Sequence, residues 1–283
     1  MKSRLLAHLA VTALFFAACS SGTASPLAPA SGAPRATAAA SSPSSAATVE
    51  ITIFGAASLK GALVKAKAAY ESVHAGTTLT ISTDSSSALE TQIEQGAPAD
   101  VFLSADATNP MKLADKGLAS GAAVSFAGNI LTVIVPTANP AGISAPADLA
   151  KSGVKVIAAG DAVPITRYAT QLVANLAKLS GYPTDFAAKY AANIASKEDN
   201  VKAIVAKIEF GEGDAGIVYV TDAKASSKVT TVDVPAAANV PATYAGVVVK
   251  ASTHQDAAAA FLTWFKGPDG QAILASFGFL APS

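Results

Sequence analysis

Charged residues are scarce in this chain of 283 residues. They make up 14% of the sequence, against roughly 25% in an average soluble protein. The 20 Lys and Arg balance the 20 Asp and Glu, so the formal net charge is zero. A nucleic-acid-binding protein needs clustered Lys and Arg to neutralise phosphates. The charge balance therefore argues against nucleic acid as a partner.

Cysteine, histidine and aromatic residues are also few. One Cys and three His leave little for a zinc site or a disulfide framework, and we expect no metal cofactor. Beyond residue 18 the sequence has no run of about 20 uncharged apolar residues, which argues against a series of transmembrane helices. Alanine is abundant and supplies most of the 51% apolar content. The composition is that of a nearly neutral, soluble protein with a large core.

The first 18 residues are typical of an export signal. Residues 1–4 are basic, and residues 5–18 form an apolar stretch that ends in small residues and is too short for a permanent anchor. The sequence Phe16-Ala17-Ala18-Cys19 resembles the lipobox of bacterial lipoproteins, in which the Cys is lipidated and becomes the mature N-terminus. Phe16 departs from the Leu that is usual in the lipobox. The alternative is an ordinary secreted protein in which Cys19 has no special role.

Residues 19–48 are nearly all Ala, Ser, Pro, Gly and Thr, with Arg35 as the only charge. Such a segment cannot bury enough apolar surface to offset the entropy of ordering, so we expect a flexible tether. A lipid anchor, a tether and a folded part together predict a protein held at the outer face of a cell membrane.

From residue 49 onward, strand-like and helix-like segments alternate. Strands are expected near residues 49–54, 79–81, 100–104, 131–135, 154–158, 215–220 and 244–250. Helices are expected near residues 59–72, 88–95, 111–116, 165–179, 200–208, 255–265 and 268–276. This alternation predicts an α/β fold with mostly parallel sheets. We divide it into two lobes, residues 49–130 with 235–283, and residues 131–234.

Four junctions at which a helix begins stand out as candidate ligand sites. Ligands of open α/β sheets bind at the carboxyl ends of the strands, where helices begin, and each helix start presents about four unpaired N–H groups. Several such starts aimed at one point form an anion site that needs no Lys or Arg. The junctions are Ala57-Ser58-Leu59, Ser85-Ser86-Ser87, Val163-Pro164-Ile165 and Asn200-Val201. For any single serine, the alternative is a helix cap with no other role.

The same residues carry a resemblance to a known family. Motifs in matching order are Phe54-Gly55-Ala56-Ala57-Ser58-Leu59, Ser85-Ser86-Ser87-Ala88-Leu89, Gly96-Ala97-Pro98-Ala99-Asp100-Val101-Phe102, Gly128-Asn129-Ile130-Leu131, Asp199-Asn200-Val201, Gly216-Ile217-Val218-Tyr219 and Phe277-Gly278-Phe279. Over about residues 49–281 the chain resembles the molybdate-binding protein of bacterial ABC importers. The resemblance implies a two-lobed periplasmic-binding-protein fold with a hinge, which closes on one molybdate or tungstate and delivers it to a membrane permease.

The resemblance also implies five ligand positions. Ser58 and Ser86 are expected to offer hydroxyl and backbone N–H groups, Ile165 and Val201 backbone N–H groups, and Tyr219 its hydroxyl. The family commonly has Pro-Ala-Gly where this chain has Pro164-Ile165-Thr166, so the cavity size could differ. Arg167 is unusual near such a site; it is either a solvated helix residue or a charge at the rim that speeds anion capture. We expect a monomer without a cofactor or catalytic residues.

Three alternatives stay open on the sequence. The nearest is a binding protein for another tetrahedral oxyanion, sulfate or phosphate. A secreted enzyme with Ser58 or Ser86 as its nucleophile would need a general base within reach. A lipid-anchored adhesion or scaffold protein would bind no small ligand.

Overall fold

The computed structural model describes residues 48–282. The predicted export signal, Cys19 and the predicted tether up to residue 47 lie outside the described residues. Within the described part, none of the helices combines the length and the apolar character needed to cross a membrane.

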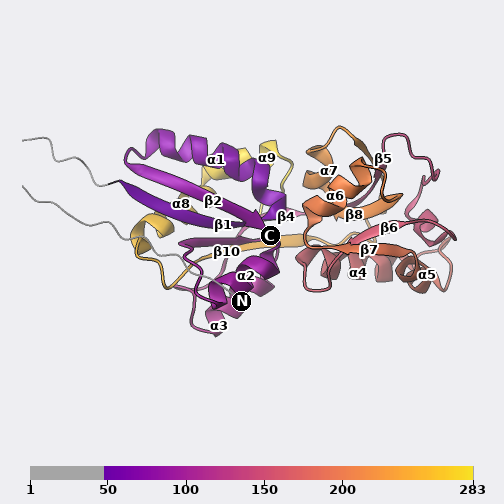
Figure 1. Ribbon diagram of the computed structural model, residues 1–283, viewed down its shortest axis with the longest axis horizontal. Coiled ribbons are helices and arrows are strands. Elements are labelled where there is room, and N and C mark those ends of the chain that lie inside the picture. Colours follow the sequence, from indigo (N-terminus) through magenta and orange to yellow (C-terminus); the bar gives the residue numbers. More distant parts are fainter. Residues whose placement is uncertain (1–47, 283) are drawn as a thin grey trace, which may run out of the picture. The chain divides into compact units, whose positions relative to one another are not determined.

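The first sheet has five strands in the order β2-β1-β3-β10-β4 (Figure 1). Helices cover both of its faces, because its central strands are apolar on both sides. The strands are β1 (Val49–Ala56), β2 (Thr77–Asp84), β3 (Val101–Ser104), β4 (Val124–Asn129) and β10 (Ala242–Val248). The helices are α1 (Lys60–Val73), α8 (Gln255–Lys266) and α9 (Pro268–Ser276) on one face, with α2 (Ser86–Glu94) and α3 (Thr108–Asp115) on the other.

The second sheet also has five strands, in the order β7-β6-β8-β5-β9. Its strands are β5 (Leu131–Pro136), β6 (Val156–Ala159), β7 (Ile194–Glu198), β8 (Ala215–Tyr219) and β9 (Val229–Val232). Its helices are α4 (Pro164–Leu176), α5 (Phe186–Ala192), α6 (Val201–Glu209) and α7 (Val220–Lys224). Residues 48–282 also form two 3₁₀ turns, η1 (Ala57–Leu59) in the first part and η2 (Pro146–Ala150) in the second. We call each sheet with its helices a lobe.

Both sheets are mixed, whereas the sequence predicts mostly parallel ones. In lobe 1, β1 pairs in parallel with β2 and β3, and β10 pairs antiparallel with β3 and β4. In lobe 2, β6 pairs in parallel with β7 and β8, and β5 pairs antiparallel with β8 and β9. The antiparallel strands β10 and β5 are those that the chain enters directly on crossing between lobes. Such a strand needs no helical crossover, so the alternation of strands and helices does not reveal its direction.

The chain crosses twice between the lobes. A single residue, Ile130, separates β4 from β5, and residues 233–241 lead back from β9 to β10. The Asn239 side chain joins the two crossings, because its Oδ1 accepts the Leu131 N–H at 3.0 Å and its Nδ2 donates to the Leu131 carbonyl at 2.8 Å. These two tied crossings are the connection about which the lobes can move as units.

Candidate ligand site between the lobes

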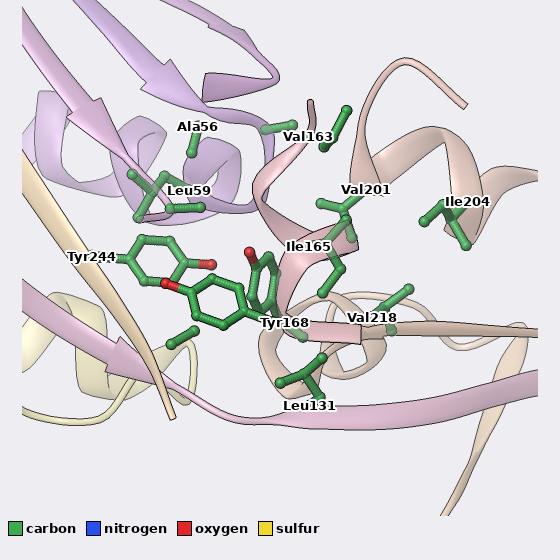
Figure 2. Close-up of a cluster of buried hydrophobic side chains, with 14 of the residues drawn as sticks. Ala56, Leu59, Leu131, Val163, Ile165, Tyr168, Val201, Ile204, Val218 and Tyr244 are labelled. Carbon is green, nitrogen blue, oxygen red and sulfur yellow. The ribbon is translucent and has the colours of Figure 1, made fainter. Parts of the chain in front are cut away.

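All five predicted ligand positions line one cavity between the lobes. Its walls come from η1 and the start of α2 in lobe 1, and from the starts of α4 and α6 with the end of β8 in lobe 2. Figure 2 shows Ala56 and Leu59 facing Val163, Ile165 and Val201 across this region. The lining residues are Ala56, Ala57, Ser58, Ser85, Ser86, Ala105, Val163, Pro164, Ile165, Asn200, Val201 and Tyr219.

The two serines at the start of α2, Ser85 and Ser86, have different roles. Ser85 is the helix cap, because its side chain accepts the N–H of Ala88 at 3.2 Å. Ser86 follows it as the first helical residue and is only 1% exposed. Its Oγ accepts the backbone N–H of Ala105 at 3.0 Å. Because that N–H occupies an acceptor position, the hydroxyl hydrogen of Ser86 is available for the cavity.

Ser58 does not cap a helix, although the sequence places it at the cap of a helix that starts at Leu59. It is the middle residue of η1, and α1 begins at Lys60 after Leu59 without a side-chain cap. Ser58, which was expected to cap the helix, is instead inside the 3₁₀ turn, and Leu59 takes the cap position of α1. The Ser58 hydroxyl lies instead 2.8 Å from the Tyr244 hydroxyl of β10.

The predicted backbone donors, Ile165 and Val201, both lie in the first turn of a helix. α4 begins at Pro164, whose ring supplies no N–H, and Ile165 follows it. α6 begins at Val201 after the cap Asn200, whose side chain accepts the N–H of Ala203 at 3.1 Å. N–H groups this early in a helix have no carbonyl partner within it. Both helix starts line the cavity, and their dipoles favour negative charge there.

Tyr219, at the end of β8, carries an unpaired donor. Its side chain is 1% exposed, and its hydroxyl is buried without a hydrogen-bond partner among the described residues. Burial raises the pKa of Tyr219 well above its ordinary value, so the hydroxyl keeps its proton at neutral pH. An unpaired buried hydroxyl costs about 1–3 kcal/mol. A ligand that accepts a hydrogen bond at this point would recover that cost.

The cavity is neutral and small. No Lys, Arg, His, Asp or Glu is among its lining residues, and its polar groups are hydroxyls, helix N–H groups and the Asn200 amide. Its volume is about 10 Å³, roughly the room of one water molecule.

A wider cavity of about 470 Å³ adjoins the inner one and shares Ser85 and Val163 with it. It is bordered by the charged residues Asp84, Asp161, Lys197, Glu198 and Asp199. Acidic groups outnumber basic ones at this opening. The lining of this wider cavity therefore does not supply the positive field that steers an anion.

Arg167 of α4 is half exposed and contacts lobe 1. Its Nη2 lies 3.2 Å from Oδ2 of Asp106 in lobe 1, and its Nη1 donates to the Thr108 hydroxyl. Asp106 is buried and also accepts hydrogen bonds from Ser104 and Asn109. Neither interpretation of Arg167 drawn from the sequence includes this partner on the other lobe, and a role in anion capture stays a prediction. The residue links lobe 2 to lobe 1.

A second polar contact joins the lobes. The Asn200 Nδ2 donates to Oδ1 of Asp84, at the end of β2, over 3.0 Å. Asn200 therefore caps α6 and bridges the lobes with one side chain. Sequence patterns identify the cap but cannot identify the bridge, because Asp84 lies 116 residues earlier.

The serine-enzyme alternative lacks a base in the described part of the chain. The hydroxyls of Ser58 and Ser86 hydrogen-bond to Tyr244 and to a backbone N–H, and not to His, Lys or a carboxylate. Nucleophilic catalysis by serine requires such a base within hydrogen-bond reach. Residues 48–282 also contain no group of three or more His, Cys, Asp or Glu that could hold a metal ion.

Comparisons with known proteins agree with this architecture. Residues 51–280 match the family model described as bacterial extracellular solute-binding protein. The molybdate-binding protein ModA of Mycobacterium tuberculosis is 33% identical over 233 residues, which cover 82% of this chain and 85% of the relative. A putative ABC transporter substrate-binding lipoprotein of Bacillus subtilis, YvgL, is 32% identical, with 85% and 90% covered.

Solved structures of solute-binding proteins also match this chain. The substrate-binding domain of a putative molybdenum ABC transporter from Clostridium difficile matches with a TM-score of 0.62 and 30% identity, covering 83% of this chain and all of that one. The sulfate-binding protein SubI of M. tuberculosis shares the fold, with a TM-score of 0.73, 21% identity, and 82% and 86% covered. The predicted two-lobed fold and the family resemblance are both confirmed. The chain therefore belongs to the bacterial extracellular solute-binding proteins, in the family that contains the molybdate-binding proteins ModA.

Proposed function

We propose that this protein binds molybdate and tungstate between its lobes and delivers them to an ABC permease in the cell membrane. The observation that carries the proposal is the Tyr219 hydroxyl, a buried donor without a partner that lines a neutral cavity. The Ser58 and Ser86 hydroxyls and the N–H groups of Ile165 and Val201 line the same cavity. The names of the ModA relatives support molybdate as the ligand.

The donors suit a fully ionised tetrahedral oxyanion. Each oxygen of such an ion accepts hydrogen bonds and brings no hydrogen of its own, so hydroxyl and N–H donors can surround it. A protonated oxyanion would present a donor to other donors, which leaves a buried polar group unpaired. The site therefore needs no positive side chain to bind a dianion.

Closure of the lobes is the step that completes the site. Ser58 and Ser86 lie on lobe 1, while Ile165, Val201 and Tyr219 lie on lobe 2. Only the closed arrangement brings both sets to one ion, so the ion binds that arrangement more tightly and increases its population. The Arg167–Asp106 and Asn200–Asp84 contacts stabilise the same arrangement.

Replacing Arg167 with alanine is expected to weaken molybdate binding about two- to fivefold, mainly through faster dissociation. Arg167 is half exposed, and ion pairs in such positions contribute about 0.2–1 kcal/mol. Asp106 keeps its bonds from Ser104 and Asn109, so the fold should be retained. Stopped-flow fluorescence measures both rate constants.

Lys197→Ala is the matched control for Arg167→Ala. It breaks the Lys197–Asp161 ion pair near the same opening, but both partners belong to lobe 2. We expect its rate constants to equal those of the wild type. Slower association of R167A with unchanged dissociation would assign Arg167 to electrostatic steering instead of closure.

The second candidate ligand is sulfate, because the fold of SubI, a sulfate-binding protein, matches this one. Sulfate and molybdate have the same charge and shape. The protein can therefore discriminate between them only by the size of its closed cavity. Molybdate has longer bonds from the central atom to oxygen and fills a larger cavity. We assign molybdate because the more closely related sequences carry that name.

A thermal-shift screen tests the proposal. Purified protein is heated with molybdate, tungstate, sulfate or phosphate in turn. A ligand present at 100 times its dissociation constant should add roughly 2.7 kcal/mol to the free energy of unfolding. A rise with molybdate and tungstate that exceeds the rise with sulfate supports the proposal. No rise with any oxyanion would contradict it and would favour an adhesion or scaffold role.

The proposal includes a lipid anchor at Cys19. It is supported by the lipobox-like sequence before Cys19 and by the name of the Bacillus relative, which is called a lipoprotein. Labelled fatty acid should enter the wild-type protein in cells and be absent from Cys19→Ser. Equal labelling of both would contradict the anchor without affecting the ligand site.

A further inference from the structure

Tyr244 lies behind Ser58, outside the set of residues that line the cavity. Its side chain is fully buried in β10, and its ring packs against Phe126, Tyr219 and Phe279 with centroid distances of 6.1, 5.6 and 5.3 Å. Its hydroxyl is 2.8 Å from Ser58 Oγ. Figure 2 shows the Tyr244 hydroxyl directed toward the space between the lobes.

The direction of this hydrogen bond is set by Asn129, the last residue of β4. Asn129 Oδ1 accepts the backbone N–H of Ile130 at 3.0 Å, which identifies the other side-chain atom as the NH₂ group. That group donates to Thr221 Oγ1 at 2.9 Å and, over 3.4 Å, to the Tyr244 hydroxyl oxygen. An amide NH₂ can only donate, so Tyr244 accepts from Asn129. Ser58 Oγ is then the one acceptor that the described residues offer to the buried hydrogen of Tyr244, and leaving that hydrogen unpaired would be costly, so we take it to point to Ser58.

The consequence reaches the ligand. Ser58 Oγ accepts the hydrogen of Tyr244, and Tyr244 is its only side-chain partner among the described residues. The hydrogen of Ser58 is therefore left for the cavity. Ser86 is oriented in the same sense by the N–H of Ala105, which it accepts. Each serine thus has one of its two acceptor positions filled by the protein, and the described residues offer no acceptor for its own hydrogen, which favours presenting that hydrogen to a bound ion.

We propose that Tyr244 and Asn129 are positioning residues that fix Ser58 as a hydrogen-bond donor and so exclude protonated oxyanions. The proposal rests on the oxyanion-binding function above and concerns how the site selects among such ions. Inorganic phosphate keeps at least one proton at neutral pH, whereas molybdate is fully ionised. With Tyr244 in place, Ser58 can accept the phosphate hydrogen only by turning its own hydrogen away from the ion, where the described residues offer it no acceptor.

Tyr244→Phe tests this role. The ring contacts remain, but Ser58 is freed to rotate and can accept the phosphate hydrogen. We expect the ratio of the dissociation constants for phosphate and molybdate to fall about two- to tenfold, the value of one hydrogen bond. Competition of phosphate against molybdate, measured calorimetrically at neutral pH, gives the ratio.

Two controls separate positioning from a structural effect. Tyr70→Phe changes another buried tyrosine of lobe 1, away from the cavity, and should leave the ratio unchanged. In a Ser58→Ala background, Tyr244→Phe should have no further effect on the ratio, because the residue on which it acts is gone. A purely structural role of Tyr244 would lower the unfolding midpoint and leave the ratio at its wild-type value.

The outcomes distinguish this inference from the function on which it rests. Wild-type protein that binds molybdate, with an unchanged ratio in Y244F, would overturn the positioning role and leave the proposed function intact. If Tyr244→Phe changed the ratio equally in the wild-type and in the Ser58→Ala background, that result would also overturn the positioning role. Wild-type protein that binds no oxyanion would overturn the proposed function and this inference together.

Discussion

Replacing Ser86 with alanine is expected to weaken molybdate binding by about 1–3 kcal/mol, which is roughly 5- to 150-fold. The substitution removes a hydroxyl that lines the cavity and is 1% exposed. It also leaves the N–H of Ala105 without its acceptor, which loosens the wall beside the ligand. Calorimetric titration of wild type and variant with molybdate measures the difference.

Ser87→Ala is the control for Ser86→Ala. Ser87 is the next residue of α2, but it lines the wider cavity and not the inner one. Its hydroxyl lies 3.2 Å from that of Ser85. We expect its affinity to be within about twofold of the wild type. Equal affinities of S86A and wild type would show that the start of α2 does not contact the ion.

Replacing Tyr219 with phenylalanine is expected to produce two effects of opposite sign. Without ligand, the free energy of unfolding should stay the same or rise, because the variant no longer buries an unpaired hydroxyl. Molybdate affinity should fall by about 1–3 kcal/mol, because the ion loses that donor. Thermal unfolding without ligand and calorimetric titration with molybdate measure the two effects on the same preparation.

Tyr190→Phe provides the comparison for Tyr219→Phe. Tyr190 is also buried in lobe 2 but does not line the inner cavity, and burial raises its pKa to about 12. Its variant should bind molybdate as the wild type does. A Y219F variant that is less stable without ligand and binds molybdate normally would make Tyr219 a core residue only.

Much of the fold can be predicted because its main elements are long and strongly patterned. β1 alternates apolar and polar residues, and α4 carries apolar residues at helical spacing. Short or polar elements cannot be predicted from the pattern of apolar residues. β7 is half exposed with the sequence Ile-Ala-Ser-Lys-Glu, and β9 is Val-Thr-Thr-Val with two exposed residues at its centre. Neither shows a periodicity that separates it from a loop.

The candidate site also has a part that the sequence predicts and a part that it does not. Helix starts depend on nearby residues, so the junctions at Ser86, Ile165 and Val201 can be found from the sequence, and the structure brings them to one cavity. Their role as ligands stays a prediction. Contacts between distant residues cannot be found in this way. Ser58 and Tyr244 are 186 residues apart, and Arg167 and Asp106 are 61 apart.

Calorimetric titration of the purified wild-type protein with molybdate and with sulfate at neutral pH tests the central claim most directly. The account predicts one binding site per chain and a lower dissociation constant for molybdate than for sulfate. Tighter binding of sulfate, or no heat of binding with either ion, would contradict it.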